Sequence, residues 1–122
     1  MDQGVYIAVF RLDTPRAIRV GRLGPFRFAA GLYFYVGSAQ RNLSARLSRH
    51  ARRRKPLRWH VDYLAAHATM LGAITLDAPR TRECELAGEL GRRFAAPVPG
   101  FGASDCRCGA HLFHTPGWAA TG

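Results

Sequence analysis

Two apolar, aromatic runs near the start of the sequence constrain the fold more than any other feature. Gly4–Leu12 reads GVYIAVFRL and stops at the turn signal Asp13-Thr14-Pro15, and Gly31–Gly37 reads GLYFYVG between two glycines. Because β-branched and aromatic residues favour extended backbone, both runs are predicted to be core strands. Between them, Ala17–Val20 and Phe26–Ala29 flank a Gly- and Pro-containing segment, which predicts a short hairpin. The first part of the chain is therefore predicted to be β-structure.

The hydrophobic period then changes from two to nearly four. Leu43, Leu47 and Ala51 form one apolar stripe of a predicted helix that Asn42 can cap and that ends before Pro56. The remaining predicted elements are a helix over Arg58–Ala68 with Trp59, Tyr63 and Leu64 buried, a buried strand over Met70–Leu76, a helix capped by Thr81 with Leu86, Leu90 and Phe94 on one face, and a short strand reached through Cys108–Phe113. The order indicates one α/β or α+β domain over residues 4–114 and a flexible tail over 115–122, without a regular βαβ repeat.

Composition narrows the functional classes. The chain has 122 residues, 48% of them hydrophobic, and a formal net charge of +10 at pH 7, which indicates one folded domain with an affinity for polyanions. Two segments without Asp, Glu, Lys or Arg, Phe28–Gln40 and Tyr63–Leu76, are too short to span a membrane, and no secretory signal is visible. An odd number of cysteines, 3, indicates reduced thiols and predicts a cytoplasmic location.

The positive charge is concentrated in one segment without a single acid. Its basic residues are Arg41, Arg46, Arg49, Arg52, Arg53, Arg54, Lys55 and Arg58. A solvated helix face would explain such a run, but uncompensated cations at this density favour phosphate contact and salt-dependent binding of nucleic acid. We expect nucleic acid, whether DNA or RNA, to be the partner.

Two tyrosines are candidates for a shared site. Tyr6 lies near the start of the first predicted strand and Tyr35 near the end of the second, so in an antiparallel pair they can share a face. Gly37 would allow a tight turn and a close approach of phosphate to the backbone. Tyrosines in strands are more often core residues than catalytic ones, so the pattern alone leaves both alternatives open.

The order of the short motifs resembles the GIY-YIG nuclease superfamily. The resemblance is carried by Gly4-Val5-Tyr6, Tyr35-Val36-Gly37-Ser38-Ala39, the helix with Arg46 and His50, Glu83 followed by Leu86, and the segments WHVDY at 59–63, GFGASDCRC at 100–108 and HLF at 111–113. Within the superfamily the chain looks most like the small stand-alone Uri branch. The resemblance implies a central three-stranded antiparallel sheet flanked by helices, to which the sequence adds the hairpin and the C-terminal strand. It also implies metal-dependent hydrolysis of phosphodiesters to 5′-phosphate and 3′-hydroxyl ends.

The resemblance also implies roles for particular residues. Tyr6 or Tyr35 would orient or deprotonate the attacking water, Arg46 would contact the scissile phosphate, and His50 would bind the phosphate or leaving group. Glu83 would hold Mg²⁺ or Mn²⁺, and one carboxylate suffices because magnesium retains several waters. Further contacts to nucleic acid are expected from Gly37, Ser38, Arg41, Arg49, Arg52, Arg53, Arg54, Lys55 and Arg58.

Two other acids could compete for these roles. In the superfamily that the chain resembles, a leucine or isoleucine follows the metal-binding Glu three positions later; Glu83 has Leu86 there and Glu85 has Gly88, so the resemblance favours Glu83, and Glu85 is interpreted as a surface acid. Asp62 is interpreted as an acid that supports a site residue without touching the substrate or, preferably, as the partner of Arg58 in a helix salt bridge.

Cysteine and histidine side chains offer a less favoured site. Cys84, Cys106, Cys108 and His111 could bind structural zinc, but the C-x-C spacing is tighter than in zinc fingers or ribbons, so zinc is not expected. His60, His67 and His114 are interpreted as exposed or packed residues without a specific partner.

Taken together, these features and the resemblance predict a small endonuclease acting on single-stranded or structured DNA in repair or processing. The alternatives are a weakly active or inactive nucleic-acid-binding module on the same fold and a basic structural protein.

Overall fold

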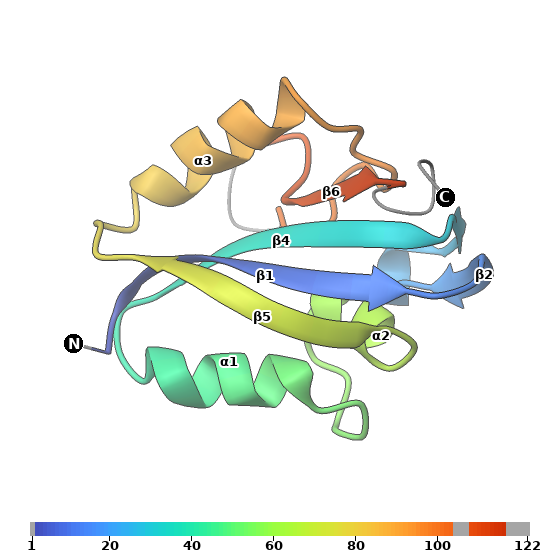
Figure 1. The fold of residues 1–122 in the computed structure, drawn as a ribbon, viewed down its shortest axis with the longest axis horizontal. Helices are drawn as coiled ribbons and strands as arrows, with labels where there is room; N and C mark the ends of the chain where they lie inside the picture. The colour runs from blue at the N-terminus through green and yellow to red at the C-terminus, as the bar shows by residue number, and fades with distance from the viewer. Residues whose placement is uncertain (1, 104–107, 117–122) are drawn as a thin grey trace.

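The computed structural model describes residues 2–103 and 108–116 and is built around one four-stranded antiparallel sheet (Figure 1). The strands lie in the order β5-β1-β4-β6. Their bounds are Gly4–Leu12 for β1, Gly31–Ala39 for β4, Thr69–Leu76 for β5 and Leu112–Thr115 for β6. The predicted α+β class is confirmed. Strands β5, β1 and β4 form a three-stranded antiparallel sheet, and the predicted C-terminal strand, β6, extends it by pairing with β4. The rest of the predicted tail, 117–122, lies outside the described residues.

The central pair β1 and β4 sets the geometry of one face of the sheet. Tyr6 pairs with Gly37 and Ala8 pairs with Tyr35, so these side chains point to the same side. The prediction that the two tyrosines share a face is confirmed, and their ring centroids lie 6.3 Å apart.

A separate two-stranded hairpin closes one end of the core. It consists of β2, Arg16–Arg19, and β3, Pro25–Phe28, joined by the 3-10 turn Gly21–Leu23. Ile18, Val20 and Phe28 are buried in the larger apolar cluster, so the predicted hairpin is confirmed and extends the core.

Three helices cover the two faces of the sheet (Figure 1). Their bounds are Leu43–Ala51 for α1, His60–Ala65 for α2 and Arg82–Gly91 for α3. Leu43, Val61 and Leu64 from α1 and α2 join Tyr6 and Phe10 in the larger core. Ala87 of α3 packs with Val5, Val36 and Phe113 on the opposite face, because neighbouring strand residues point to opposite sides.

The start of α1 differs from the sequence prediction. Asn42 precedes the helix in a left-handed conformation, with φ of 58°, and its side chain makes no capping bond. The N-terminus supplies the cap, since Asp2 Oδ1 accepts hydrogen bonds from the backbone N–H and the hydroxyl of Ser44, at 2.7 and 2.8 Å. A residue remote in sequence therefore does what Asn42 was expected to do. At α3, Thr81 occupies the predicted N-cap position, also without a side-chain capping bond.

Helix α2 is shorter than the predicted helix over Arg58–Ala68, and of the three side chains predicted to be buried only Leu64 is fully so, while Tyr63 is half-buried. Val61 and Leu64 are fully buried, whereas Trp59 is 38% exposed because it precedes the helix in an extended conformation. The predicted burial of Trp59 is wrong, and its ring lies beside the pocket described below.

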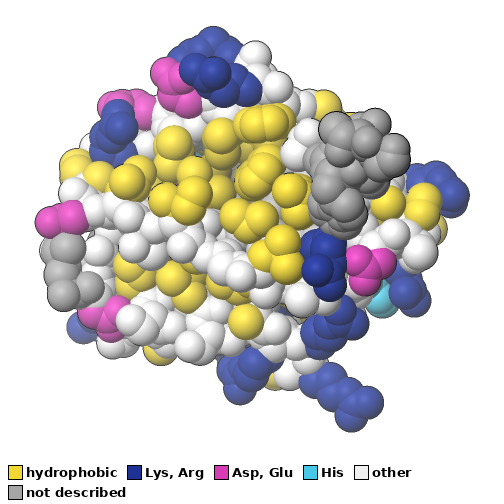
Figure 2. Space-filling view, in the orientation of Figure 1, with side chains coloured by type: hydrophobic (Ala, Val, Ile, Leu, Met, Phe, Trp, Pro, Cys, Tyr) yellow, Lys and Arg dark blue, Asp and Glu magenta, His cyan; other side chains and the backbone are white. Residues whose placement is uncertain are grey.

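Strand β5 is present as predicted, but it is not buried. It lies at the sheet edge, and Leu71, Ile74 and Leu76 are 51%, 56% and 38% exposed. Figure 2 shows apolar side chains across this face of the molecule. A run without charges therefore marked a strand correctly but did not distinguish a central strand from an edge strand. Among the described residues, no helix has the length and apolar character needed to cross a membrane.

Candidate active site

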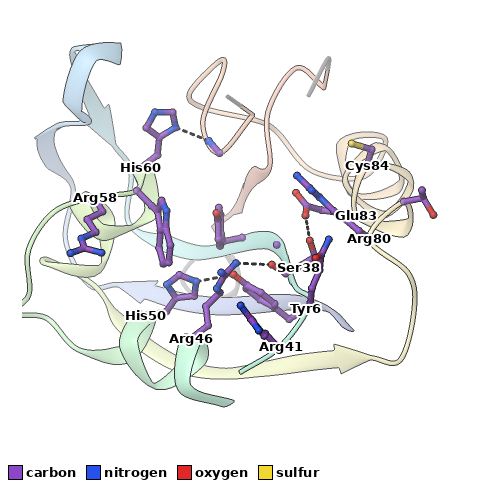
Figure 3. Close-up of a pocket in the computed structure, with 16 residues that line it drawn as sticks. Tyr6, Ser38, Arg41, Arg46, His50, Arg58, His60, Arg80, Glu83 and Cys84 are labelled. Atoms are coloured by element: carbon purple, nitrogen blue, oxygen red, sulfur yellow. Dashed lines mark hydrogen bonds between the residues drawn. The ribbon is translucent and has the colours of Figure 1, made fainter. Parts of the chain in front are cut away.

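A pocket of about 820 Å³ opens where β1 and β4 meet α1, the start of α2 and the start of α3 (Figure 3). Its lining contains most of the site residues predicted from sequence. These are Tyr6, Tyr35, Gly37, Ser38, Arg41, Arg46, His50, Arg58 and Glu83. Residues from both halves of the chain thus converge on one cavity.

Gly37 makes room for Tyr6. A Cβ at position 37 would lie 2.5 Å from both Cζ and the hydroxyl oxygen of Tyr6, closer than real side chains allow. Gly37 lies within β4 and not in the tight turn expected from the sequence. Its missing side chain lets the tyrosine ring lie across the neighbouring strand.

Tyr6 and His50 form a buried pair. The Tyr6 hydroxyl lies 2.8 Å from Nε2 of His50, and the two residues are 2% and 1% exposed. Burial lowers the pKa of His50 from 6.5 to about 4, assisted by the charges of Lys55, Arg46 and Arg49, so the ring is neutral at pH 7. His50 also lines the pocket, and its expected contact with the phosphate or leaving group stays a prediction.

Both pocket tyrosines are held in the protonated form by their surroundings. Burial raises the pKa of Tyr6 and of Tyr35 well above 10.0, while the positive charge of Arg46 acts in the opposite direction on each. Any ionisation of a tyrosine in this pocket therefore depends on added positive charge or hydrogen bonds.

Arg46 lies between the ring of Trp59 and the carbonyl of Ser38, near the end of β4. Its Nη1 donates a 2.8 Å hydrogen bond to the carbonyl of Ser38, and its guanidinium carbon lies 5.0 Å from the centre of the Trp59 ring. Arg46 and His50 are four residues apart on α1, and both line the pocket, as their helical spacing predicted. The contacts with Ser38 and Trp59 fix the guanidinium beside the pocket (Figure 3).

Glu83 reaches the pocket from the start of α3. Its Oε1 accepts a 2.5 Å hydrogen bond from the Ser38 hydroxyl, and its Oε2 lies 2.9 Å from Nδ1 of His111. Burial alone would raise the pKa of Glu83, but the bonds from His111 and Ser38 outweigh it, and the pKa is lowered. Glu85, by contrast, is exposed and pairs with Arg82 outside the pocket.

Asp62 has a different partner from the predicted one. Its carboxylate accepts hydrogen bonds from Nη1 and Nη2 of Arg49 at 2.8 and 3.1 Å, whereas Arg58 contributes only its backbone N–H, at 2.8 Å. The backbone N–H of Trp59 adds a bond of 2.9 Å. The predicted salt bridge to the Arg58 side chain is wrong, because Asp62 turns back to cap its own helix and faces α1.

Two predicted nucleic-acid contacts are used inside the protein. Lys55 is 1% exposed at its side chain and donates to the carbonyls of Arg49, His50 and Arg52 at the end of α1. Arg49 is engaged by Asp62 and Trp59. The Lys55 side chain is therefore buried, whereas the Arg49 side chain is 18% exposed, and the predicted contacts of both with nucleic acid stay predictions.

The rest of the basic run divides between pocket and surface. Arg41 and Arg58 line the pocket. Arg52, Arg53 and Arg54 are exposed beyond α1, where Arg53 donates to Thr69, and they do not line the pocket. Figure 2 shows Lys and Arg side chains gathered at the lower right of the molecule.

Sequence reasoning missed several pocket residues. Arg80 and Thr81 were not assigned to the site, and His60, given no partner, accepts a 2.8 Å hydrogen bond from the backbone N–H of Gly102. Ser38 was assigned a nucleic-acid contact only, whereas it bridges Arg46 and Glu83. Only Arg80 could have been found from the sequence, because it lies three residues before Glu83. The contacts of His60 and Ser38 join segments that are remote in sequence.

The cysteines show a second departure from expectation. Sγ of Cys84, Sγ of Cys108 and a ring nitrogen of His111 all lie within 4.8 Å of one another. Cys106, named with them from the sequence, lies outside the described residues.

His114, which was expected to have no specific partner, also makes contacts within the protein. Its Nε2 lies 3.0 Å from the carbonyl of Ala30, and its ring packs at a tilt against Tyr33.

The side chains that line the pocket can bind an anion through their guanidinium groups and a metal cation through one carboxylate. Among the residues that the structure describes, four arginines and one acid, Glu83, line the pocket. Guanidinium groups form planar, bidentate bonds to phosphate, and a carboxylate is suited to a hard divalent cation. The tyrosyl hydroxyls add neutral hydrogen-bonding groups between the two.

Comparison with known proteins gives one family. No curated protein and no solved structure matches the chain significantly. A family model described as a domain of unknown function, DUF123, matches residues 5–120, which include every strand and helix of the structure apart from Gly4 at the start of β1. The chain therefore belongs to the DUF123 family.

Proposed function

We propose that the chain is a GIY-YIG-type, metal-dependent endonuclease acting on DNA, within the Uri-like branch. One observation carries the proposal: Tyr6, Tyr35, Arg46 and Glu83, remote from one another in sequence, line the same pocket. The pocket is rich in arginine and accessible from solvent, as a site for a sugar-phosphate backbone must be. Repair or processing of single-stranded or structured DNA fits a domain of this size, because none of its predicted or described elements is a base-reading module.

The residues present fit a hard divalent cation at Glu83. The carboxylate lines the pocket, and its lowered pKa keeps it ionised at neutral pH. Ser38 and His111 each engage one oxygen, which fixes the orientation of the group while each oxygen retains a further lone pair. Bound Mg²⁺ or Mn²⁺ would supply charge stabilisation for the phosphoryl oxygens.

Arg46 is assigned to the phosphate. Its contacts with Ser38 and Trp59 hold the guanidinium before substrate arrives, so little conformational entropy is lost when it meets the phosphoryl oxygens. Arg41, Arg58 and Arg80 line the same pocket and would bind flanking phosphates.

Tyr6 is assigned to the attacking water, with His50 as its positioning residue. Nδ1 of His50 is buried and has no partner among the described residues. This favours the tautomer that carries its proton on Nε2 and donates it to the Tyr6 oxygen, since a buried N–H without an acceptor is costly. Tyr6 would first release its own proton to solvent, and His50, by its hydrogen bond, and Arg46, by its charge, would stabilise the resulting phenolate. The phenolate would then accept a proton from the attacking water.

The test is a cleavage assay on single-stranded, duplex and branched DNA with and without Mg²⁺. Glu83→Gln and Arg46→Ala should each lower the rate by about 100- to 1,000-fold, because each removes charge stabilisation of the transition state. Glu85→Gln is the matched control, since this acid lies on the same helix outside the pocket, and its rate should stay within about twofold of wild type.

The products and the binding data separate the alternatives. Ends that a ligase rejoins directly would support 5′-phosphate and 3′-hydroxyl products. Tight binding of DNA without any cleavage would favour the binding module instead. Full activity in Glu83→Gln would contradict the assignment of the metal ligand.

A further inference from the structure

We propose that Cys84, Cys108 and His111 form a zinc site beside the pocket, distinct from the cation site at Glu83. The two sulfur atoms and a ring nitrogen lie within 4.8 Å of one another, although Cys84 belongs to α3 and the other two precede β6. Zinc binding by these residues does not depend on the nuclease function proposed above.

The backbone around these ligands is tied down independently of any metal. The carbonyl of Gly109 accepts a 2.7 Å bond from the N–H of Gly100, and the carbonyl of Phe101 accepts a bond of the same length from the N–H of His111. The carbonyl of His111 accepts a 2.9 Å bond from Val36 of β4. The segment that carries Cys108 and His111 is thereby attached to the sheet, so the convergence on Cys84 is a property of the fold.

The donor set selects the ion. Thiolates and imidazole suit zinc, whereas magnesium prefers oxygen ligands, so the thiol cluster and the carboxylate of Glu83 would take different metals. In a tetrahedral zinc site the ligand atoms lie about 3.3–3.8 Å apart, which rotation of side chains already within 4.8 Å can reach. Cys84 is exposed, so a water molecule can reach the fourth position.

His111 would connect the two metal sites, because one of its ring nitrogens would bind zinc while the other contacts Glu83. Its Nδ1 lies 2.9 Å from Oε2 of Glu83, and ligating histidines commonly bond a carboxylate through the nitrogen that does not bind the metal. The proposal therefore assigns Nε2 of His111 to zinc. Zinc would hold the imidazole, and the imidazole would hold Glu83 in its pocket orientation.

The first experiment measures metal content and spectra. Protein freed of metal and titrated with Zn²⁺ should bind one equivalent, and Co²⁺ should give a cobalt–thiolate charge-transfer band in the near ultraviolet. Cys84→Ser and Cys108→Ser should each weaken zinc binding by at least about 10-fold and reduce the cobalt band. His67→Asn, a histidine outside the cluster, is the control and should bind zinc like wild type.

A second measurement covers the case of a variant that does not fold. In wild-type protein, zinc should slow alkylation of both Cys84 and Cys108, mapped by mass spectrometry, and a chelator should restore the rate. Failure of wild type to bind zinc, undiminished binding by Cys84→Ser, or alkylation rates unaffected by zinc would each overturn the proposal. None of these measurements depends on DNA cleavage, so they are independent of the outcome of the nuclease test.

Discussion

Two acids beside the pocket, Asp62 and Glu83, have opposite surroundings. Asp62 is fully buried and meets the Arg49 guanidinium, the Lys55 ammonium at 3.9 Å, and the backbone N–H groups of Arg58 and Trp59. Glu83 is 20% exposed at its side chain and meets a neutral hydroxyl and one imidazole nitrogen. The protein therefore neutralises Asp62 completely, whereas Glu83 faces the pocket with capacity for a further partner.

The contrast shows why the type of residue does not determine its role. Burial would raise the pKa of either acid, and in both cases hydrogen bonds reverse the effect and lower it. At Asp62 the groups that do so are the charged Arg49 guanidinium of α1 and two backbone N–H groups, which makes it a structural link between α1 and α2. At Glu83 they are mainly dipoles and hydrogen bonds, which orient the carboxylate without neutralising it.

The largest effect is expected from Asp62→Asn. Loss of the negative charge leaves Arg49 and Lys55 without their counter-charge, and removing one partner of a buried pair costs about 3–5 kcal/mol. Urea unfolding at pH 7 measures the change. Glu83→Gln should cost less than about 1 kcal/mol in the same experiment, because its side chain already reaches solvent. Equal losses in the two variants would show that the two acids are not different in kind.

An intermediate effect is expected from pH. The pKa of His50 is lowered from 6.5 to about 4, so its contribution to stability is fully present above pH 6.5 and is lost as the pH falls toward 4. The groups that face it include Tyr6, Arg46, Arg49, Lys55 and Asp62.

The corresponding loss of unfolding free energy between pH 7 and pH 5 is about 2 kcal/mol. The contribution of Glu83 has a separate window, because its pKa is lowered from 4.5 and its part is lost only below that pH. Unfolding titrations of wild type and His50→Gln measure the difference, and His67→Asn serves as a comparison that should remove a smaller part of the fall, because His67 is less buried and its pKa is lowered too. A fall that is as steep in His50→Gln would assign the loss to other groups.

The smallest effect is expected from Ser38→Ala. The change removes the 2.5 Å bond to Oε1 of Glu83 and should lower stability by about 1 kcal/mol while raising the pKa of Glu83. Unfolding and a carboxyl titration followed by NMR measure the two quantities. Ser48→Ala, an exposed position on α1, should change stability by less than about 0.5 kcal/mol. An unchanged Glu83 titration in Ser38→Ala would mean that His111 alone orients the acid.

Much of the site could be predicted because it depends on local periodicity. The period of two places Tyr6 and Tyr35 on one face of an antiparallel pair, and the helical repeat places Arg46 and His50 on one side of α1. The choice of Glu83 over Glu85, by contrast, came from the resemblance to the nuclease superfamily, and of these two acids the structure places only Glu83 in the pocket.

Other features could not be predicted because their partners are remote in sequence. Asp2 caps α1 across 42 positions, and Ser38 meets Glu83 across 45. The C-x-C spacing of Cys106 and Cys108 argued against a zinc site, yet the path of the chain brings the sulfur atoms of Cys84 and Cys108 together.

By itself, the sequence determined the strands, the helical stripes, the shared face of the tyrosines and an excess of positive charge, since each depends on composition or on residues a few positions apart. Only the tertiary structure decided which cations are used internally, as Lys55 and Arg49 are, and which face the pocket, as Arg46 does. It also decided that β5 is an exposed edge. The physical reason is that burial and charge pairing are set by elements that approach one another only when the chain is packed.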